Sequence, residues 1–453
     1  MHKLSLGLLL SLSLFSQTKA QQLPAYAFKN VTIHTHDGKS IEKASIVWRN
    51  GSITDYGTKV SIPFDAKVTD GGDSLHVYPG FIDGFSEMAA PDEKPNNDRV
   101  EKPGEPPYDR SGIQPERIPS ASADFSKKDV KDAQKEGFTS ALIGLKGLML
   151  PGQLDFFHLG GKDAQSNLLV SSLGQKGAFK NTRNVYPSTL MGTMYLFRQL
   201  WENASALQIK QQSYESNPTK NDNPGRDLTL EALYPVINKK QPLYFQADDK
   251  ESIERILKLK KELGFDLVLV SAKEAFRYTD LLKKEKVPVL VSFDFPGKPD
   301  WKVKEEKAEK AAKEAKKDST NAKTDSTIAK KVEKEVPADI IAFRAKQMSA
   351  YNDFVKNTKT LLDAGLNPGF SSIGLKWADF SKNIESMIEA GMTENELVSV
   401  LTENTAKVLG LSNQTGKIEN GYLADFAVFT KPFTAKKAKL LQRVVKGEVY
   451  ELN

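Results

Sequence analysis

Residues Pro79 to Met88 read PGFIDGFSEM, and this stretch decides the fold. It opens with a Pro-Gly pair, continues with two apolar residues and then reaches the carboxylate of Asp83. We expect Asp83 to be a scaffold residue that accepts hydrogen bonds from buried backbone donors. Glu87 follows, with Phe85 beside it. Its carboxylate is predicted either to be vestigial or paired at the surface, or to bind a basic ligand or a hard cation such as Ca²⁺.

Alternating stretches with turn dipeptides occur near both ends of the chain. Asn50-Gly51 is a strong hairpin signal, because both residues accept the left-handed backbone that tight turns need. We expect residues 21–78 and 412–453 to form a small composite β-sandwich built from both chain ends. Its predicted strands lie at 27–35, 44–56, 424–429 and 441–450.

Between these ends, apolar runs rich in β-formers alternate with segments of helical periodicity. Such alternation is typical of parallel strands joined by crossover helices, so the fold class is α/β and a (β/α)8 barrel over residues 79–411 is the leading architecture. Residues 301–337 are rich in Lys, Glu and Ala and are predicted to be a charged insertion, two helical arms with a flexible middle, before the eighth strand. The predicted strands are 138–145, 243–247, 267–271 and 289–294, and the predicted helices are 252–263, 274–284 and 393–409.

These motifs together resemble the amidohydrolase superfamily. Its signature Pro-Gly-apolar-apolar-Asp-x-His-x-His is similar to PGFIDGFSE, and LTENTAKVLGL with GKIENGYLADFAVF resembles the segment that leaves the barrel and rebuilds the sandwich. LPGQLDFFHLGG and YPSTLMGTMYLFRQLWENA resemble the imidazolonepropionase-like and dipeptidase-like members. The resemblance implies a barrel with a sandwich over the whole mature chain. It also implies hydrolysis of carbon–nitrogen bonds at zinc or another divalent metal.

The chain departs from this family at each metal-ligand position that can be matched. Members place two histidines after strand 1, one histidine each after strands 5 and 6, and an aspartate after strand 8. The strand 4 ligand cannot be matched, and the strand 8 segment offers Ser371 and Ser372 but no aspartate before Asp379. The residues at the other positions are Phe85, Glu87, Gln246 and Ser271.

The histidine content leads to the same expectation. After position 20, His34, His36 and His76 precede the barrel and only His158 lies within it. A zinc site that uses three or four imidazoles cannot be assembled from one. We therefore expect no metal and no other cofactor. His34 and His36 share one face of a strand, but they belong to the predicted sandwich, so a structural role is favoured.

Three residues are weak catalytic candidates: Glu87, Asp294 and His158. Asp294 ends an apolar strand, which is where barrels present catalytic groups. His158 follows two phenylalanines and is favoured as a packed, hydrogen-bonded histidine, with a residual role in the pocket as the alternative. The chain has no G-x-S-x-G, no P-loop and no G-x-G-x-x-G in a βα context.

The first 20 residues have the pattern of a secretory signal peptide, with Lys3, an apolar run from Leu4 to Phe15 and the small residue Ala20. The run is shorter than the ~20 residues that span a bilayer, so we expect an exported protein, periplasmic or secreted, without a membrane span. The absence of cysteine excludes disulfides. The net charge of +6 is modest, and lysines are interleaved with acidic residues, which argues against nucleic-acid binding.

Three functions are compatible with these expectations. The favoured one is an exported amidohydrolase-family protein with a degenerate metal site that is catalytically impaired. It would act as a partner or binding subunit, with an active paralogue or in a homo-oligomer. The second is an active hydrolase of carbon–nitrogen bonds with an altered site that uses Glu87, Asp294 and His158. The third is a periplasmic solute-binding barrel that holds a small molecule at its mouth.

Overall fold

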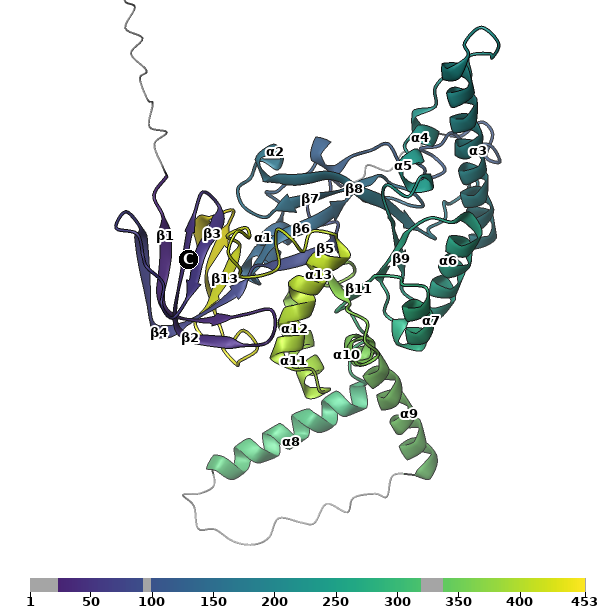
Figure 1. Cartoon of the computed structure of the whole chain (residues 1–453). Coiled ribbons are helices and arrows are strands. Elements are labelled where there is room, and N and C mark those ends of the chain that lie inside the picture. Colours follow the sequence, from purple (N-terminus) through teal and green to yellow (C-terminus); the bar gives the residue numbers. More distant parts are fainter. Residues whose placement is uncertain (1–22, 93–98, 319–336, 453) are drawn as a thin grey trace, which may run out of the picture.

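The computed structural model describes residues 23–92, 99–318 and 337–452. Two sheets organise the chain, a seven-stranded sheet on one side and an eight-stranded, barrel-like sheet beside it (Figure 1). The predicted signal peptide and the middle of the charged insertion lie outside the described residues. Within the described ranges, no helix combines the length and the apolarity needed to cross a membrane.

The seven-stranded sheet takes its strands from both chain ends. Asn50 and Gly51 have φ angles of 53° and 77°, so the predicted turn makes a hairpin of the second and third strands. The two ends of the sheet meet, since Trp48 Nε1 donates to Gly447 O at 2.9 Å, and an apolar core fills the curl between them. The expected sandwich is therefore one curled sheet. Its order is β15 (Glu448–Glu451), β14 (Leu440–Val445), β13 (Phe426–Phe429), β4 (Lys67–Pro79), β1 (Tyr26–His34), β2 (Ser40–Arg49) and β3 (Ser52–Gly57).

The eight-stranded sheet confirms the barrel-like architecture but corrects the expectation that all its strands are parallel. Its order is β12 (Gly369–Ser371), β11 (Val289–Ser292), β10 (Leu267–Ser271), β9 (Leu243–Ala247), β8 (Leu168–Ala178), β7 (Gln153–His158), β6 (Phe138–Gly144) and β5 (Phe81–Ser86). β7 runs antiparallel to both β6 and β8, whereas the other pairs are parallel. The loops that flank β7 are too short for the crossover helices that parallel neighbours require.

β12 closes the barrel against β5. Ser371 Oγ donates to Phe85 O at 2.8 Å, and Ser372 N donates to Asp83 Oδ1 at 3.0 Å. The interior is packed with side chains and is not a pore, as is usual for small barrels. Residues of α13 (Glu403–Val408) and the loop after it join the interior cluster. The strand residues of this cluster are Ile82, Phe85, Leu142, Leu154, Phe156, Tyr244, Val268, Val270 and Leu290.

Helices pack around this barrel, except that the helix over residues 300–318 projects away from it (Figure 1). The further helices are α1 (Lys128–Lys135), α2 (Ala164–Asn167), α3 (Leu190–Ser216), α4 (Leu228–Glu231), α5 (Tyr234–Ile237), α6 (Lys250–Leu263), α7 (Thr279–Lys284), α8 (Asp300–Asp318), α9 (Ala338–Val355), α10 (Asn357–Asp363), α11 (Phe380–Glu389) and α12 (Glu394–Leu401). The predicted helix 252–263 is α6. It begins because Asp249 accepts a hydrogen bond from Ser252 N at 2.8 Å, and it ends at Gly264 with φ 78°.

Two other helix predictions need correction. In place of the predicted helix 274–284, the structure has the shorter helix α7, which begins at residue 279. The predicted helix 393–409 is two helices, α12 and α13, which break at Thr402 with φ −131° and ψ −94°. The first predicted arm of the charged insertion is α8, and the second lies outside the described residues. The insertion does precede the eighth strand, β12.

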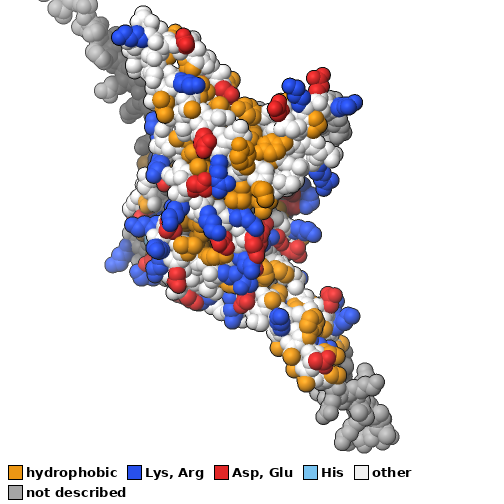
Figure 2. Space-filling view, turned by 90° about the vertical axis from the view of Figure 1, so that its right-hand side faces the viewer, with side chains coloured by type: hydrophobic (Ala, Val, Ile, Leu, Met, Phe, Trp, Pro, Cys, Tyr) orange, Lys and Arg blue, Asp and Glu red, His pale blue; other side chains and the backbone are white. Residues whose placement is uncertain are grey.

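The side of the molecule that carries α3, α6 and α7 shows cationic and anionic side chains interspersed (Figure 2). α3 also presents exposed apolar side chains, among them Met191 and Tyr195, which are 82% and 61% exposed. This side therefore has no large patch of a single charge sign, and its exposed apolar side chains offer some contact area.

Gly84 of β5 is predicted to be a position that only glycine can fill. A Cβ atom there would lie 2.6 Å from Leu290 Cδ2 and 2.9 Å from Thr405 Cγ2, where β5, β11 and α13 meet. We expect Gly84→Ala to lower the free energy of unfolding by about 1–3 kcal/mol through overpacking. Gly161→Ala is the control, because no atom lies within 4 Å of its Cβ position. Urea unfolding of both variants measures the effect, and equal stabilities would contradict the packing described.

Candidate functional site

The candidate site lies at the mouth of the barrel, where its parallel strands end. Phe85 on β5 is fully buried in the interior cluster, and Glu87 follows it. Gln246 on β9 is half-buried and Ser271 at the end of β10 is buried. Gln246 Oε1 and Ser271 Oγ have no hydrogen-bond partner among the described residues. The φ of Ser271 is 70°, in a left-handed region that is unfavourable by about 1 kcal/mol for such a residue.

Lys176 is the central side chain of this mouth, and sequence analysis missed it. It lies on β8, the fourth barrel strand, where no ligand could be matched. Its side chain is fully buried, and its Nζ donates to Glu87 Oε1 and, at 2.6 Å, to Leu145 O. The same Nζ lies 5.5 Å from the centre of the Phe85 ring. A lysine ammonium therefore contacts both residues that replace the first histidine pair.

The ion pair between Lys176 and Glu87 is asymmetric in its exposure. The side chain of Lys176 is 1% exposed and that of Glu87 is 22% exposed. A buried ammonium loses several kcal/mol of hydration, so it is kept only when its partners are well placed. The carboxylate, the Leu145 carbonyl and the face of the Phe85 ring supply such partners. The carboxylate of Glu87 is therefore already paired with a cationic side chain of the protein itself.

Asp83 acts as the expected scaffold residue on the side facing β12. Its Oδ1 accepts hydrogen bonds from Phe85 N at 3.2 Å and from Ser372 N at 3.0 Å. Its Oδ2 has no hydrogen-bond partner among the described residues. Burial raises the pKa of Asp83 to about 7, and the hydrogen bonds from Ser372 and Phe85 only partly oppose this shift.

Asp294 lies on the rim of the mouth, just after β11. Lys273 Nζ donates to its Oδ2 at 2.5 Å, and its backbone N donates to Ser292 Oγ at 3.1 Å. Asp294 is therefore paired with a lysine of its own. Within the described residues, no hydrogen bond or ion pair joins Asp294 to Glu87, so these two carboxylate candidates belong to separate ion pairs.

His158 lies at the opposite end of the barrel. Because β7 is antiparallel to its neighbours, its last residue, His158, pairs with Ser140 near the start of β6. His158 Nδ1 is 3.7 Å from Asp425 Oδ2, and burial raises the pKa of Asp425. Asp425 O accepts a hydrogen bond from Gly80 N, so this pair lies where the two sheets join. The structure does not bring His158 together with Glu87 or Asp294. His158 is packed as expected, but neither of its ring nitrogens has a hydrogen-bond partner among the described residues.

The other histidines belong to the seven-stranded sheet and its edge. His34 and His36 do not act as a pair. His34 Nε2 instead lies 2.9 Å from His76 Nδ1, and its ring stacks on Tyr78 with centres 4.1 Å apart. Burial lowers the pKa of His34 to about 4. His36 Nε2 lies 3.7 Å from Glu419 Oε1. These contacts are those of structural histidines.

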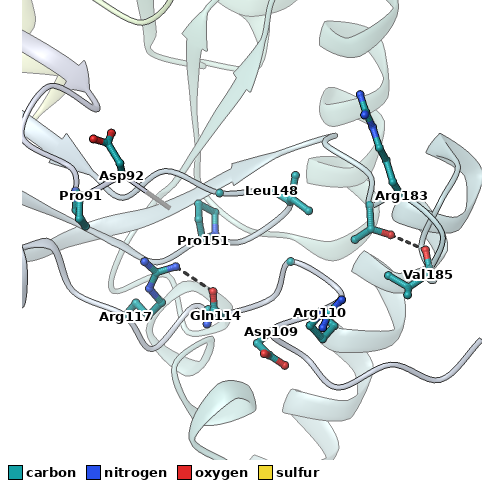
Figure 3. A pocket seen from close by; sticks show the side chains of 13 residues that line it. Pro91, Asp92, Asp109, Arg110, Gln114, Arg117, Leu148, Pro151, Arg183 and Val185 are labelled. Carbon is teal, nitrogen blue, oxygen red and sulfur yellow. Dashed lines mark hydrogen bonds between the residues drawn. The ribbon is translucent and has the colours of Figure 1, made fainter. Parts of the chain in front are cut away.

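Two cavities open at the mouth. One of about 400 Å³ is lined by Glu87, Lys146 and Ser372. A larger one of about 670 Å³ is lined by Pro91 and Asp92 after β5, Leu148 and Pro151 after β6, and Thr182, Arg183 and Val185 after β8 (Figure 3). The ion pair of Asp92 with Lys146, 2.7 Å long, stands between them.

The residues present do not fit the divalent metal that the family resemblance implies. Across residues 23–92, 99–318 and 337–452, no group of three or more histidine, aspartate or glutamate side chains could hold a metal ion. The positions that should ligate offer a phenyl ring, a carboxylate already bound to an ammonium, an amide and a hydroxyl. A neutral hydroxyl and an amide are poor ligands for zinc, which prefers thiolate, imidazole and carboxylate.

Known proteins support the architecture. A family model described as the amidohydrolase family matches residues 321–450. No curated protein matches the chain. An amidohydrolase structure from Thermotoga maritima MSB8 is similar over 94% of this chain and 100% of its own, with 21% sequence identity and a TM-score of 0.71. A prolidase complexed with N-methylphosphonate-L-proline is similar over 95% of this chain and 100% of its own, with 12% identity and a TM-score of 0.52.

Truncation of Glu87 should expose the cost of the buried ammonium. We expect Glu87→Ala to lower the free energy of unfolding by about 3 kcal/mol, because it leaves Lys176 buried without its carboxylate. Adding Lys176→Met should restore part of the loss. The control is Glu254→Ala, which breaks a surface pair with Lys258 and should cost less than about 0.5 kcal/mol. Chemical denaturation measures all four proteins, and a neutral Glu87→Ala variant would contradict this account.

The burial of Asp83 should appear in the pH dependence of stability. Its folded pKa of about 7 exceeds its ordinary value of 3.8, so the folded chain binds more protons than the unfolded chain between these values. The contribution of Asp83 to stability is therefore full below pH 4 and is lost as pH rises towards 7. Unfolding curves from pH 4 to 8 should show this loss, of a few kcal/mol, in the native protein but not in Asp83→Asn. Asp129→Asn, at an exposed position, should keep the native pH dependence.

Proposed function

Because this chain belongs to the amidohydrolase superfamily, we propose that it keeps the scaffold without the metal-dependent hydrolysis and serves as an exported partner or binding subunit. The observation that carries this proposal is the buried ammonium of Lys176 at the mouth, bound to Glu87. A divalent cation placed near these residues would face that positive charge instead of a set of neutral imidazoles.

Electrostatics and ligand chemistry support the loss of metal-dependent hydrolysis. A bound divalent metal makes hydroxide available near neutral pH by lowering the pKa of its water. That effect needs a metal held by several ligands, and Glu87 is the one carboxylate among the four matched positions. Repulsion between a dication and an ammonium a few ångströms away costs several kcal/mol in a site of low dielectric. Glu87 could serve a metal only if Lys176 lost its proton or moved.

The cavities at the mouth support a binding role. Volumes of about 400 Å³ and 670 Å³ fall within the range of ~300–1,000 Å³ that is usual for small-molecule sites. Their walls combine charged side chains with apolar ones, including Leu148, Pro151 and Trp377. The barrel could therefore hold a ligand without converting it, alone or as part of an assembly.

The proposed export and association rest on the N-terminal sequence and on exposed apolar side chains of α3. The N-terminal basic and apolar pattern supports export to the periplasm or beyond, although those residues lie outside the described part. The exposed Met191 and Tyr195 on α3 supply apolar area for a partner, either an active paralogue or a second copy.

Metal analysis of the full-length protein purified from its native host tests the loss of metal chemistry. We expect less than about 0.1 zinc per chain, and no rise in the unfolding temperature when zinc is added. Cyclic amides and dipeptides should not be hydrolysed with added Zn²⁺, Mn²⁺ or Ca²⁺.

Two outcomes would reject the proposal. One is a monomer that carries a stoichiometric, tightly bound zinc. The other is turnover that Glu87→Gln abolishes, which would favour an active hydrolase with an altered site. Size-exclusion chromatography with mass spectrometry of the same native preparation tests association, because a partner subunit should elute with its partner or as an oligomer.

A further inference from the structure

We propose that the exposed face of α3 is the interface of a twofold dimer, so that the partner it binds is a second copy of this chain. In this dimer two α3 helices lie antiparallel, and the N-terminal half of each helix packs into a groove beside the C-terminal half of the other. The dimer rests on the association part of the proposed function and names the partner, but it does not require an inactive barrel.

The exposed side of α3 carries a stripe of apolar side chains. Like Met191 and Tyr195, Ile209 is well exposed, at 63%. On a helix with about 3.6 residues per turn these three positions share one face, together with the exposed Glu202 and Ala206. The opposite face of α3 is already buried in the main hydrophobic cluster. The helix therefore presents a second apolar surface that the described residues leave uncovered.

A groove runs beside the C-terminal half of this stripe. It has a volume of about 640 Å³ and lies between α3 and the loop that leads to α4, at the end of α3 that projects beyond the sheets (Figure 1). The loop is fixed on the helix, because Asn221 Nδ2 donates to Ser213 O at 2.8 Å and Gln211 Nε2 donates to Gly225 O at 3.1 Å. The groove is therefore formed before a partner arrives. The apolar residues of its lining are Ala206, Leu207, Ile209, Pro224 and Leu230.

A twofold axis matches the stripe to the groove. In an isologous dimer, a residue i that contacts residue j of the other copy is matched by residue j contacting residue i. The projecting Met191 and Tyr195 lie on the N-terminal half of α3, and the groove lies beside its C-terminal half. When two such helices cross antiparallel near their midpoints, Tyr195 of each copy faces the groove beside Ala206 of the other. An unrelated partner would have to supply both features, whereas a second copy already carries them.

The charges near the midpoint of α3 favour the same arrangement. Within the described ranges, the carboxylate of Glu202 has no ion pair or hydrogen bond. Arg198 lies one turn earlier and is held in place by Glu262, with Arg198 Nε 2.6 Å from Glu262 Oε1. An antiparallel crossing brings Glu202 of each copy beside Arg198 of the other, whereas a parallel crossing would set the two Glu202 carboxylates against each other. Such exposed pairs add little affinity, but they fix the orientation of the partners.

The size of this contact predicts a dimer of modest affinity. The dimer would cover three large apolar side chains from each copy. At about 150 Å² for each side chain, the contact area comes near the ~1,000 Å² that a specific interface should clear. We therefore expect a dissociation constant of roughly micromolar size, with the monomer populated at lower protein concentrations.

Sedimentation analysis of the protein purified alone, at roughly 1 to 100 μM, tests the proposal. We expect a reversible dimer. Tyr195→Ala removes a side chain that enters the groove and Ala206→Arg fills the groove, so each should weaken dimerisation by at least about tenfold. The matched control is Phe64→Ala, which removes an exposed aromatic ring between β3 and β4 and should leave dimerisation unchanged. All three positions are exposed, so the variants should keep the native unfolding temperature.

Cysteine cross-linking tests the antiparallel geometry, because the chain has no cysteine of its own. The double variant Tyr195→Cys, Ala206→Cys should form covalent dimers on mild oxidation, since each new thiol faces its counterpart in the other copy. Neither single variant should do so, because antiparallel helices keep equal positions apart. Covalent dimers of the single variant Tyr195→Cys would indicate parallel helices and would overturn the proposed arrangement.

Two sedimentation results would also overturn the proposal. One is a native protein that stays monomeric at about 100 μM, and the other is a dimer that neither Tyr195→Ala nor Ala206→Arg weakens. These results are separate from the test of metal chemistry. A monomer without zinc would reject the α3 dimer and leave the loss of metal chemistry standing, whereas a dimer of this kind with tightly bound zinc would do the reverse.

Discussion

The mouth of this barrel depends on keeping one fully buried ammonium group neutralised. Lys176 reaches Glu87, the Leu145 carbonyl and the Phe85 ring, which follow or belong to β5 and β6, while Lys176 itself lies on β8. Because an unpaired ammonium would be costly at that depth, the three strand ends must hold their relative positions. The chain's own cation thus lies beside the two residues that replace a histidine pair, and the proposed loss of metal chemistry follows from that contact.

Much of the fold could be predicted from the sequence because its signals are local. The strands expected at 243–247 and 267–271 are found with those bounds, since each is a short run of β-formers set apart by polar residues. Asn50-Gly51 makes the expected hairpin for the same reason. The break at Thr402 was not predictable, because helical periodicity continues across it. The reversed direction of β7 was not predictable either, because strand direction depends on which neighbours pair.

The site was less predictable than the fold. The replacements at Phe85 and Glu87 follow from counting along one motif, and the structure places both at the mouth. Lys176 carried no signal, because 89 residues separate it from Glu87 and its strand mixes small, polar and apolar residues. His158 was placed among the candidates by its position within the barrel sequence. Its actual place, beside Asp425, depends on the direction of β7.

The meander of β6, β7 and β8 has a consequence for how the polypeptide assembles. Its strands pair with sequence neighbours, as Gly144 does with Leu154, so their contacts close short loops at a small entropic cost. The seam between β5 and β12 instead joins Ser371 to Phe85 across 286 residues. During synthesis, the edge of β5 that faces β12 in the folded barrel therefore stays uncovered until β12 has emerged from the ribosome. Over that interval the nascent chain is vulnerable to intermolecular strand pairing, and chaperones that shield such edges would determine its yield.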